Sequence, residues 1–172
     1  MHASRKRAMG HMGKSAGFKG KIAVMGLLER HGDGKSRVQT RVIANNKRSQ
    51  LQPVIREQVT EGANVYTDAL MSYKGLDANY IHGVIDHAEA YVDGQVHTNG
   101  LENFWSLLKR AIRGTYVNVE PFHLFRYLDE QSFRFNNRAM NDAARFALAL
   151  KGIINKRLTY VALTGSELPQ TC

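Results

Sequence analysis

A change in hydrophobic periodicity along the chain constrains the fold more than any other feature. Residues 21–30 and 37–44 are short apolar or alternating runs, and the turn-forming residues 31–36 lie between them. This pattern predicts a β-hairpin. Further along, apolar residues recur at helical spacing, interrupted by two more strand-like runs. The remaining predicted elements are a helix from Asn45 or Asn46 to about residue 59, strands at 63–68 and 80–86, and helices at about 97–112, 122–136 and 141–154.

A hairpin followed by strands that alternate with helices is typical of an α/β fold with a sheet of mixed direction. The strand at 63–68 is expected to be buried. The helix at 97–112 is expected to end at Gly114, and residues 158–172 are expected to form a short turn-like tail. The 172 residues correspond to one domain, and a hydrophobic share of 43% suffices for a core.

The charge balance points to a polyanionic partner. The sequence contains twenty-four Lys and Arg residues and fifteen Asp and Glu residues, which gives a formal net charge of +9. This excess favours DNA or RNA, although a solvated basic surface is the structural alternative. Residues 1–20 are rich in glycine and basic residues and are expected to form a flexible arm. Its cations Arg5, Lys6 and Arg7 can contact phosphates.

Other composition features exclude several classes of protein. No apolar run approaches the roughly 20 residues that a membrane helix needs, so no membrane partner is expected. The single cysteine, Cys172, rules out an internal disulfide and a cysteine-based zinc site. One terminal thiol suits a reducing cytoplasm, which is the expected location.

The segment 97–110 carries the strongest local pattern. On a helix, one apolar stripe and one polar line lie on neighbouring faces. The stripe contains Leu101, Trp105, Leu108 and Ile112, and the polar line contains Glu102, Ser106, Lys109 and Arg113. A carboxylate in line with cations can hold a divalent metal near phosphates. Asn99 followed by Glu102 also matches a capping box, which needs no function.

Asp68 is the second candidate acid, because it ends the predicted strand 63–68. The carboxyl end of a strand is where open α/β sheets place ligand chemistry. Alternatively, Asp68 caps a short helix at residues 69–73. Together with Glu102 it would supply paired acids for two Mg²⁺ ions about 4 Å apart. Lys109, two turns beyond Glu102, would then lie where a DNA phosphate approaches.

Three stretches resemble a known family. They are Tyr66-Thr67-Asp68, His97-x-Asn99-x-x-Glu102-x-Phe104-Trp105-Ser106-x-x-Lys109-Arg110, and Phe133-Arg134-Phe135-Asn136-Asn137-Arg138. This pattern resembles the ISXO-type branch of bacterial insertion-sequence transposases. That branch belongs to the DDE superfamily, which has a ribonuclease H-like (retroviral-integrase-like) catalytic domain. The resemblance runs from about residue 19 to residue 163.

The resemblance implies metal-dependent cleavage and joining of DNA strands, with Mg²⁺ as cofactor and Mn²⁺ as substitute. Asp68 would be the second catalytic acid, and either Glu102 or Asn99 the third catalytic position. His97 would be the motif histidine that orients metal or substrate. The implied partners are transposon-end and target DNA, together with a second copy or a full-length transposase. The DNA-contacting cations would be Lys109, Arg110 and Arg113 beside those of the arm.

The chain departs from the family pattern in one respect. The family's first acid lies in an Asp-Glu-x-Tyr-x-Gly stretch upstream of a basic loop, whereas no acid precedes Glu29 here. We therefore expect residues 21–138 to be a truncated catalytic domain that lacks the first central strand, with 139–172 as its C-terminal helix and tail. Such a copy would be weakly active or inactive.

Two further hypotheses stand beside this one. The first is a non-catalytic, basic DNA-binding remnant that can associate with full-length transposase. The second is a metal site formed by His82, His87 and His97. Their spacing does not favour the metal site, because no two of them lie four residues apart as zinc ligands on one helix would.

Overall fold

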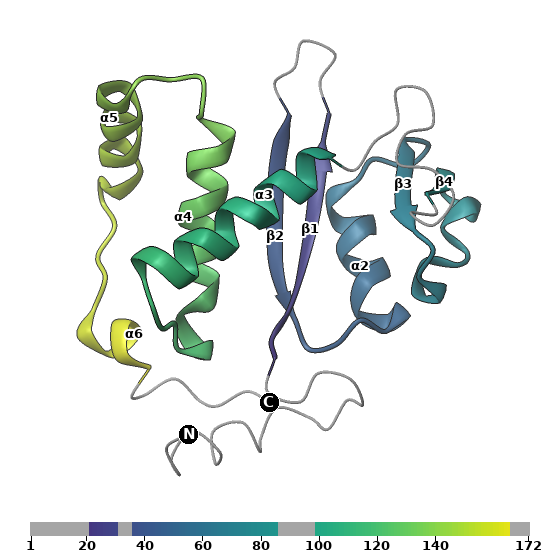
Figure 1. Cartoon of the computed structure of the whole chain (residues 1–172), viewed down its shortest axis with the longest axis horizontal. Coiled ribbons are helices and arrows are strands. Elements are labelled where there is room, and N and C mark those ends of the chain that lie inside the picture. The colour runs from purple at the N-terminus through teal and green to yellow at the C-terminus, as the bar shows by residue number, and fades with distance from the viewer. Residues whose placement is uncertain (1–20, 31–35, 86–98, 166–172) are drawn as a thin grey trace.

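The computed structural model describes residues 21–30, 36–85 and 99–165, with Asn99 described in its backbone alone. Figure 1 shows the arrangement of strands and helices. The main elements are β1 (Ala23–Glu29), β2 (Arg37–Ile43), α2 (Arg48–Gln58), β3 (Asn64–Asp68), β4 (Ile81–Ile85), α3 (Asn99–Arg110), α4 (Leu124–Asn136), α5 (Asp142–Ile153) and α6 (Tyr160–Thr164). Short helical turns lie at Met71–Tyr73, Leu76–Ala78, Ala111–Thr115 and Pro121–His123.

The predicted hairpin is confirmed. β1 and β2 pair antiparallel, from Ala23 opposite Ile43 to Glu29 opposite Arg37. The second pair, β3 and β4, is parallel, from Asn64 opposite Ile81 to Asp68 opposite Ile85. Both strand directions are therefore present, as the prediction of a mixed sheet requires.

The strands do not join into the single sheet that the sequence predicts. They form two separate two-stranded sheets, β1–β2 and β3–β4. Among the described residues no strand hydrogen-bonds to the second edge of β1 or of β3. The expected burial of β3 is also wrong, since its residues are exposed or half-buried and Tyr66 is 50% exposed. A strand with one neighbour and one covered face keeps its other face in solvent.

Helix α2 packs against both sheets. Its Leu51, Val54 and Ile55 form one core cluster with the hairpin residues Met25 and Ile43 and with Leu76 and Tyr80 from the β3–β4 region. This apolar layer is what holds the two sheets together. The start of the helix differs from the prediction, because Lys47 is the N-cap residue. Asn45 instead accepts a hydrogen bond from the Lys47 backbone N–H (2.9 Å), which shapes the turn before the helix.

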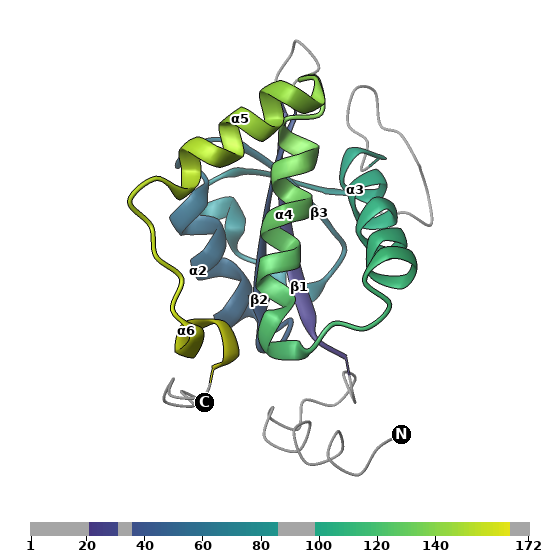
Figure 2. The ribbon, with the colours of Figure 1, turned by 90° about the vertical axis from the view of Figure 1, so that its left-hand side faces the viewer.

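A second core lies on the other side of the hairpin. It contains Val38 of β2, Phe104 and Leu108 of α3, and Leu128 and Phe135 of α4. In Figure 2 the hairpin is seen nearly edge-on, with α2 on one side, α3 on the other and α4 along β2. The hairpin is thus covered on both faces by helices far apart in the sequence.

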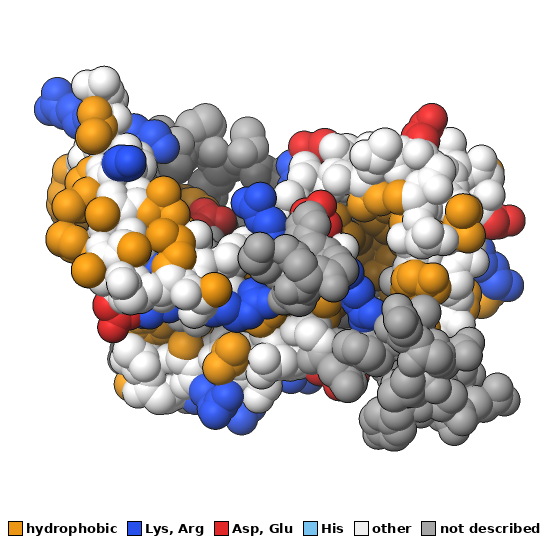
Figure 3. Space-filling model, turned by 90° about the horizontal axis from the view of Figure 1, so that it is seen from above, with side chains coloured by type: hydrophobic (Ala, Val, Ile, Leu, Met, Phe, Trp, Pro, Cys, Tyr) orange, Lys and Arg blue, Asp and Glu red, His pale blue; other side chains and the backbone are white. Residues whose placement is uncertain are grey.

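The C-terminal region adds two helices. α5 falls within the predicted helix and begins with Asn141, whose side chain accepts a hydrogen bond from the Ala144 N–H. The tail, expected to be turn-like, contains α6, which Thr159 caps. Figure 3, the view from above, shows hydrophobic side chains gathered at the α5 end of the molecule. None of the helices described is both long and apolar enough to cross a membrane.

Gly114 does not end α3 as expected. The helix continues into a π-helical turn at Ala111–Thr115, which includes Gly114. The backbone reaches the left-handed region only at Val117, with φ of 58°. A β-branched residue rarely adopts this conformation, so the segment after the π turn is strained.

Candidate functional site

Asp68 lies at the carboxyl end of β3, and its carboxylate is exposed. The backbone N–H of Leu70 donates to Asp68 Oδ1 (3.3 Å), just before the short helix Met71–Tyr73. The N-cap residue of this short helix is Leu70, so Asp68 does not cap a helix at residues 69–73 as its structural interpretation predicts; its carboxylate shapes the turn before the helix instead. A long hydrogen bond to one exposed oxygen leaves a carboxylate in a position where it can also bind a cation.

Two neighbouring side chains shape the surroundings of Asp68. Thr67 Oγ1 and His82 Nε2 are hydrogen-bonded across the β3–β4 pair (2.8 Å). This contact gives His82 a structural role, while His87 and His97 lie outside the described residues. Burial of Tyr73 raises the pKa of its phenol, and the negative charge of Asp68 raises it further. Tyr73 therefore stays neutral beside the Asp68 carboxylate at ordinary pH.

Helix α3 is placed by close packing against β1. A Cβ built on Gly26 would lie 2.5 Å from the Trp105 ring, and one on Gly100 would lie 2.8 Å from Leu28. Two glycines thus let the helix and the strand approach closely. The most buried residue of α3 is Phe104, at 1% exposure, which the predicted stripe of Leu101, Trp105, Leu108 and Ile112 omits.

The opposite side of α3 carries the predicted functional side chains. Glu102 lies in the first turn, Lys109 and Arg110 lie in the last turn, and all three are exposed. This distribution also suits the helix dipole, which favours acids at the N-terminus and cations at the C-terminus. Asn99 begins the helix, but its side chain is outside the described part, so the predicted capping box stays a prediction.

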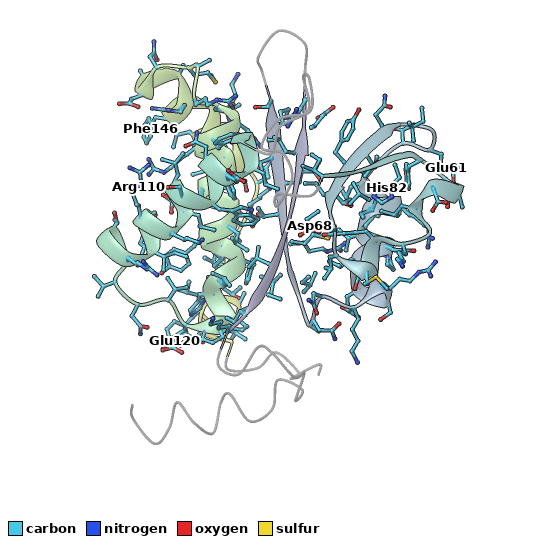
Figure 4. The ribbon with its side chains drawn as sticks, turned by 45° about the vertical axis from the view of Figure 1, so that its right-hand side comes forward. Glu61, Asp68, His82, Arg110, Glu120 and Phe146 are labelled. Carbon is cyan, nitrogen blue, oxygen red and sulfur yellow. The ribbon has the colours of Figure 1, made fainter. Side chains whose placement is uncertain are left out.

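The two ends of the candidate site lie apart. In Figure 4, Asp68 lies on the β3 side of the hairpin and Arg110 on the side of α4 and α5. Arg113 lies in the π turn that follows Arg110, and its side chain is exposed as well. The arm with Arg5, Lys6 and Arg7 is outside the described residues.

Carboxylate oxygens are suitable ligands for Mg²⁺, and Asp68 and Glu102 both offer them. Within residues 21–30, 36–85 and 99–165, however, no group of three or more His, Cys, Asp or Glu side chains could hold a metal ion. The donor type fits a divalent cation, whereas the number of ligands that the described residues bring together falls short of a two-metal site.

The sequence pattern predicts no role for Asn136 or Arg138, and the structure shows what they do. The Val38 N–H donates to Asn136 Oδ1 (2.7 Å), and Asn136 Nδ2 donates to the Val38 carbonyl (2.9 Å). Arg138 donates to the Ser36 carbonyl (2.9 Å) and stacks over the Phe135 ring. These side chains attach the end of α4 to β2. The only sequence signal for this attachment was that the amide of Asn136 and the guanidinium of Arg138 come soon after the aromatic residues Phe133 and Phe135.

A second polar contact joins the strained segment to α4. The Tyr116 hydroxyl donates to Glu130 Oε2 (2.6 Å), and the Tyr116 ring packs edge-on against Tyr127. The hydrogen bond to Glu130 raises the pKa of Tyr116, with smaller contributions from burial and from the Glu130 charge. Tyr116 thereby stabilises the chain between the π turn and α4.

Comparison with known proteins identifies the family. The domain described as "ISXO2-like transposase domain" matches residues 2–136. A protein of Haemophilus influenzae described as an uncharacterized transposase-like protein is 36% identical over 104 residues, which cover 60% of this chain and 84% of that protein. No solved structure matches the chain. The matched stretch contains Asp68 and all of α3, so the resemblance seen in the motifs is confirmed. The chain belongs to the ISXO2-like family of insertion-sequence transposases.

Proposed function

We propose that this chain acts in DNA transposition, contributing Asp68 and Glu102 to a ribonuclease H-like site for metal-dependent cleavage and joining of DNA strands. The observation that carries the proposal is the position of Asp68. A family-matched chain presents this carboxylate, exposed, at the carboxyl end of a parallel strand. Ligand chemistry is found at this position in open α/β sheets.

The metal in this proposal is Mg²⁺, with Mn²⁺ as substitute. When bound, it would activate the attacking oxygen and stabilise the leaving one. Asp68 and Glu102 are the residues that would hold it. A further acidic ligand is needed, because the described residues hold no group of three potential ligands. We propose that this acid is carried by a strand that pairs with the open edges of β1 and β3.

This arrangement predicts weak or absent catalysis by the chain alone. Two features of the described residues support that view: the unpaired edges of β1 and β3, and the lack of a group of three potential metal ligands. They also favour the alternative function, a non-catalytic DNA-binding chain that associates with full-length transposase. In both cases the protein works on DNA in the cytoplasm, where its single terminal cysteine would stay reduced.

DNA would be bound by the exposed cations of α3 and of the turn after it, Lys109, Arg110 and Arg113, together with Arg5, Lys6 and Arg7 of the arm. The formal charge of +9 supports a polyanionic partner. Contacts of this type are with phosphates and depend strongly on salt concentration. They position the DNA without reading its sequence.

The test is a strand-cleavage assay with DNA that carries the terminal sequences flanking the reading frame. The chain is assayed with Mg²⁺, alone and together with a full-length family member whose own Asp68 counterpart is changed to Ala. We expect no cleavage alone and restored cleavage in the mixture. Asp68→Ala and Glu102→Gln in this chain should abolish the restoration.

The matched control is Asp77→Ala, which removes another exposed acid from the same region. It should leave cleavage unchanged. Asn99→Ala distinguishes the third catalytic position: if Asn99 rather than Glu102 holds that position, Asn99→Ala abolishes cleavage and Glu102→Gln does not. Restoration that survives Asp68→Ala would refute the catalytic proposal. Salt-dependent DNA binding with no restoration under any condition would establish the non-catalytic alternative.

A further inference from the structure

A pocket lies where the start of α4 meets α6. Its lining side chains come from one face at the start of α4 and from α6, and they are His123, Arg126, Tyr127, Glu130 and Leu163. The pocket encloses about 330 Å³, close to the lower limit of roughly 300 Å³ for ligand pockets. Figures 1 and 2 both show α6 beside the lower end of α4. The pocket therefore has room for one small chemical group and not for a longer segment of a partner protein.

Helix α6 is held in place as one wall of this pocket. It has only five residues, too few to be stable as an isolated helix. Arg126 Nη2 donates to the Ala162 carbonyl (2.6 Å). The Phe122 ring lies against Gly165, where an added Cβ would be 2.8 Å from the ring. These contacts keep Leu163 beside the pocket with 44% of its surface exposed, so it offers an apolar surface to a ligand.

The pocket combines an aromatic surface with hydrogen-bond donors and an acceptor. The Tyr127 ring is held by edge-on packing against Tyr116, with 4.6 Å between the ring centroids. Arg126 Nε and Nη1 are bonded to none of the described residues, so both can donate to a ligand. Glu130 Oε2 accepts from the Tyr116 hydroxyl (2.6 Å) and keeps a second lone pair. Arg134 pairs with the other Glu130 oxygen (2.9 Å), which offsets the negative charge of this carboxylate.

These groups fit an unpaired nucleobase better than a phosphate alone. A base is planar, so it stacks on an aromatic ring or a guanidinium plane, and its edge carries donors and acceptors. A carboxylate accepts from an exocyclic amine, such as N4 of cytosine, whereas it repels a phosphate. A cation for the phosphate of the same nucleotide is nearby in the chain, because the exposed Arg113 lies in the π turn shortly before Tyr116.

We propose that this pocket binds the base of one unpaired DNA nucleotide. The base stacks on Tyr127, Glu130 accepts from its exocyclic amine, and Arg126 donates to an acceptor on its edge. A base that is still paired within a duplex cannot enter such a pocket. The inference rests on the DNA binding of the proposed function, and it adds a site for single-stranded DNA beside the cations that follow α3.

The experiment measures DNA binding by the full chain through fluorescence anisotropy. One short duplex is used in three forms: blunt, with an unpaired cytosine tail, and with a tail of abasic sites, which keeps the phosphates but lacks the bases. We expect the cytosine tail to increase affinity about ten-fold over the blunt duplex, and the abasic tail less than about three-fold. The gain from the base should persist at higher salt concentration, although every form then binds more weakly.

Variants of the chain test whether the gain comes from this pocket. Tyr127→Phe keeps a ring for stacking and should keep the gain, whereas Tyr127→Leu should remove it. Leu163→Glu should remove it as well. The matched control is Leu158→Glu, which adds the same charge at an exposed position that does not line the pocket. Both glutamate variants should bind the blunt duplex equally, so the ratio of tailed to blunt affinity separates them.

A further variant tests the acceptor. Uracil carries a carbonyl where cytosine carries its exocyclic amine, so the wild-type chain should prefer a cytosine tail to a uracil tail. Glu130→Gln, which can donate as well as accept, should lose this preference.

Equal affinity of the wild-type chain for the blunt and the cytosine-tailed duplex would overturn the proposal. So would a full gain from the abasic tail, or a gain that Leu163→Glu and Leu158→Glu reduce equally. These outcomes differ from failure of the proposed function, in which the wild-type chain binds none of the three DNAs. Absent cleavage with an intact gain from the tail would leave the pocket as a site of the non-catalytic, DNA-binding alternative.

Discussion

Asn136 gives the sharpest test of how α4 is attached to the hairpin. Its amide accepts from the Val38 N–H and donates to the Val38 carbonyl, at 2.7 and 2.9 Å. Both Val38 groups point away from β1, so this one side chain takes the place that a neighbouring strand would have. It thereby covers the outer edge of β2, which would otherwise be open to pairing with another chain. We predict that Asn136→Ala destabilises the fold.

The magnitude follows from the two backbone groups that the substitution exposes. Val38 is 1% exposed, so its N–H and carbonyl lose their partners in a nearly dry place. Each unsatisfied buried group costs about 1–3 kcal/mol. Asn136 itself is only half-buried, so water reaches the site in part. We therefore expect a loss of about 2–4 kcal/mol, which for a chain of this length lowers Tm by roughly 5–15 °C.

The measurement is thermal and urea unfolding followed by circular dichroism, for Asn136→Ala and Asn136→Asp. Aspartate keeps the shape and the acceptor but turns a carboxylate oxygen toward the Val38 carbonyl, so it should be no better than alanine. The control is Asn137→Ala, because the Asn137 amide bonds to Phe133 of its own helix (2.8 Å) and not to the strand. It should cost less than about 1 kcal/mol.

If Asn136→Ala and Asn137→Ala lower the free energy of unfolding by the same amount, this reasoning is refuted. A wild-type Tm in Asn136→Asp would refute it as well, since the loss of the donor would then be unimportant. A decrease only in the slope of the unfolding free energy against urea concentration would instead mean that the substitution changes the unfolded chain.

Three further predictions test other parts of the structure. Gly26→Val should force Trp105 out of its contact with β1, lowering stability by about 1–3 kcal/mol and exposing the indole, which tryptophan fluorescence measures. Tyr116→Phe should cost about 1 kcal/mol by removing the bond to Glu130. The pKa of Tyr116 is raised in the folded chain. The extra stability of the wild type over Tyr116→Phe should therefore be fully present below pH 10 and be lost as the pH rises further. Urea unfolding at several pH values across that range measures this difference. Lys109→Gln should lower the salt dependence of DNA binding by about one unit in the log–log slope without changing sequence preference, and an unchanged slope would contradict the phosphate contact.

Elements whose apolar period is local were predictable. The hairpin, the helix α4 and the order of strands and helices follow from alternation and from turn residues, and the structure confirms them. The tail was less readable, because α6 has only five residues, and its attachment depends on a distant partner. Arg126 donates to the Ala162 carbonyl of α6 (2.6 Å), a contact between residues 36 positions apart.

The division into two sheets could not be read from the chain. Strand runs show period and length, but they do not show which edges remain open. The role of Asn136 was hidden for a similar reason, since it pairs with a residue 98 positions earlier. For the site, the sequence singled out Asp68 and the basic face of α3, and the structure gives their places.

The position of α2 has a consequence for motion. The hairpin and the β3–β4 pair share no strand hydrogen bonds among the described residues, and the α2 cluster is the apolar layer common to both. Asp68 belongs to one side of this layer and α3 to the other. Transient opening of the α2 cluster would therefore change the separation of the two candidate acids without unfolding either sheet. The second core cluster still covers the other face of β1 and β2 in such an opening. Amide hydrogens of β3 and β4 should therefore exchange with solvent sooner than those of β1 and β2. Helix α2 is thus a spacer between the sheet that carries Asp68 and the hairpin against which α3 packs.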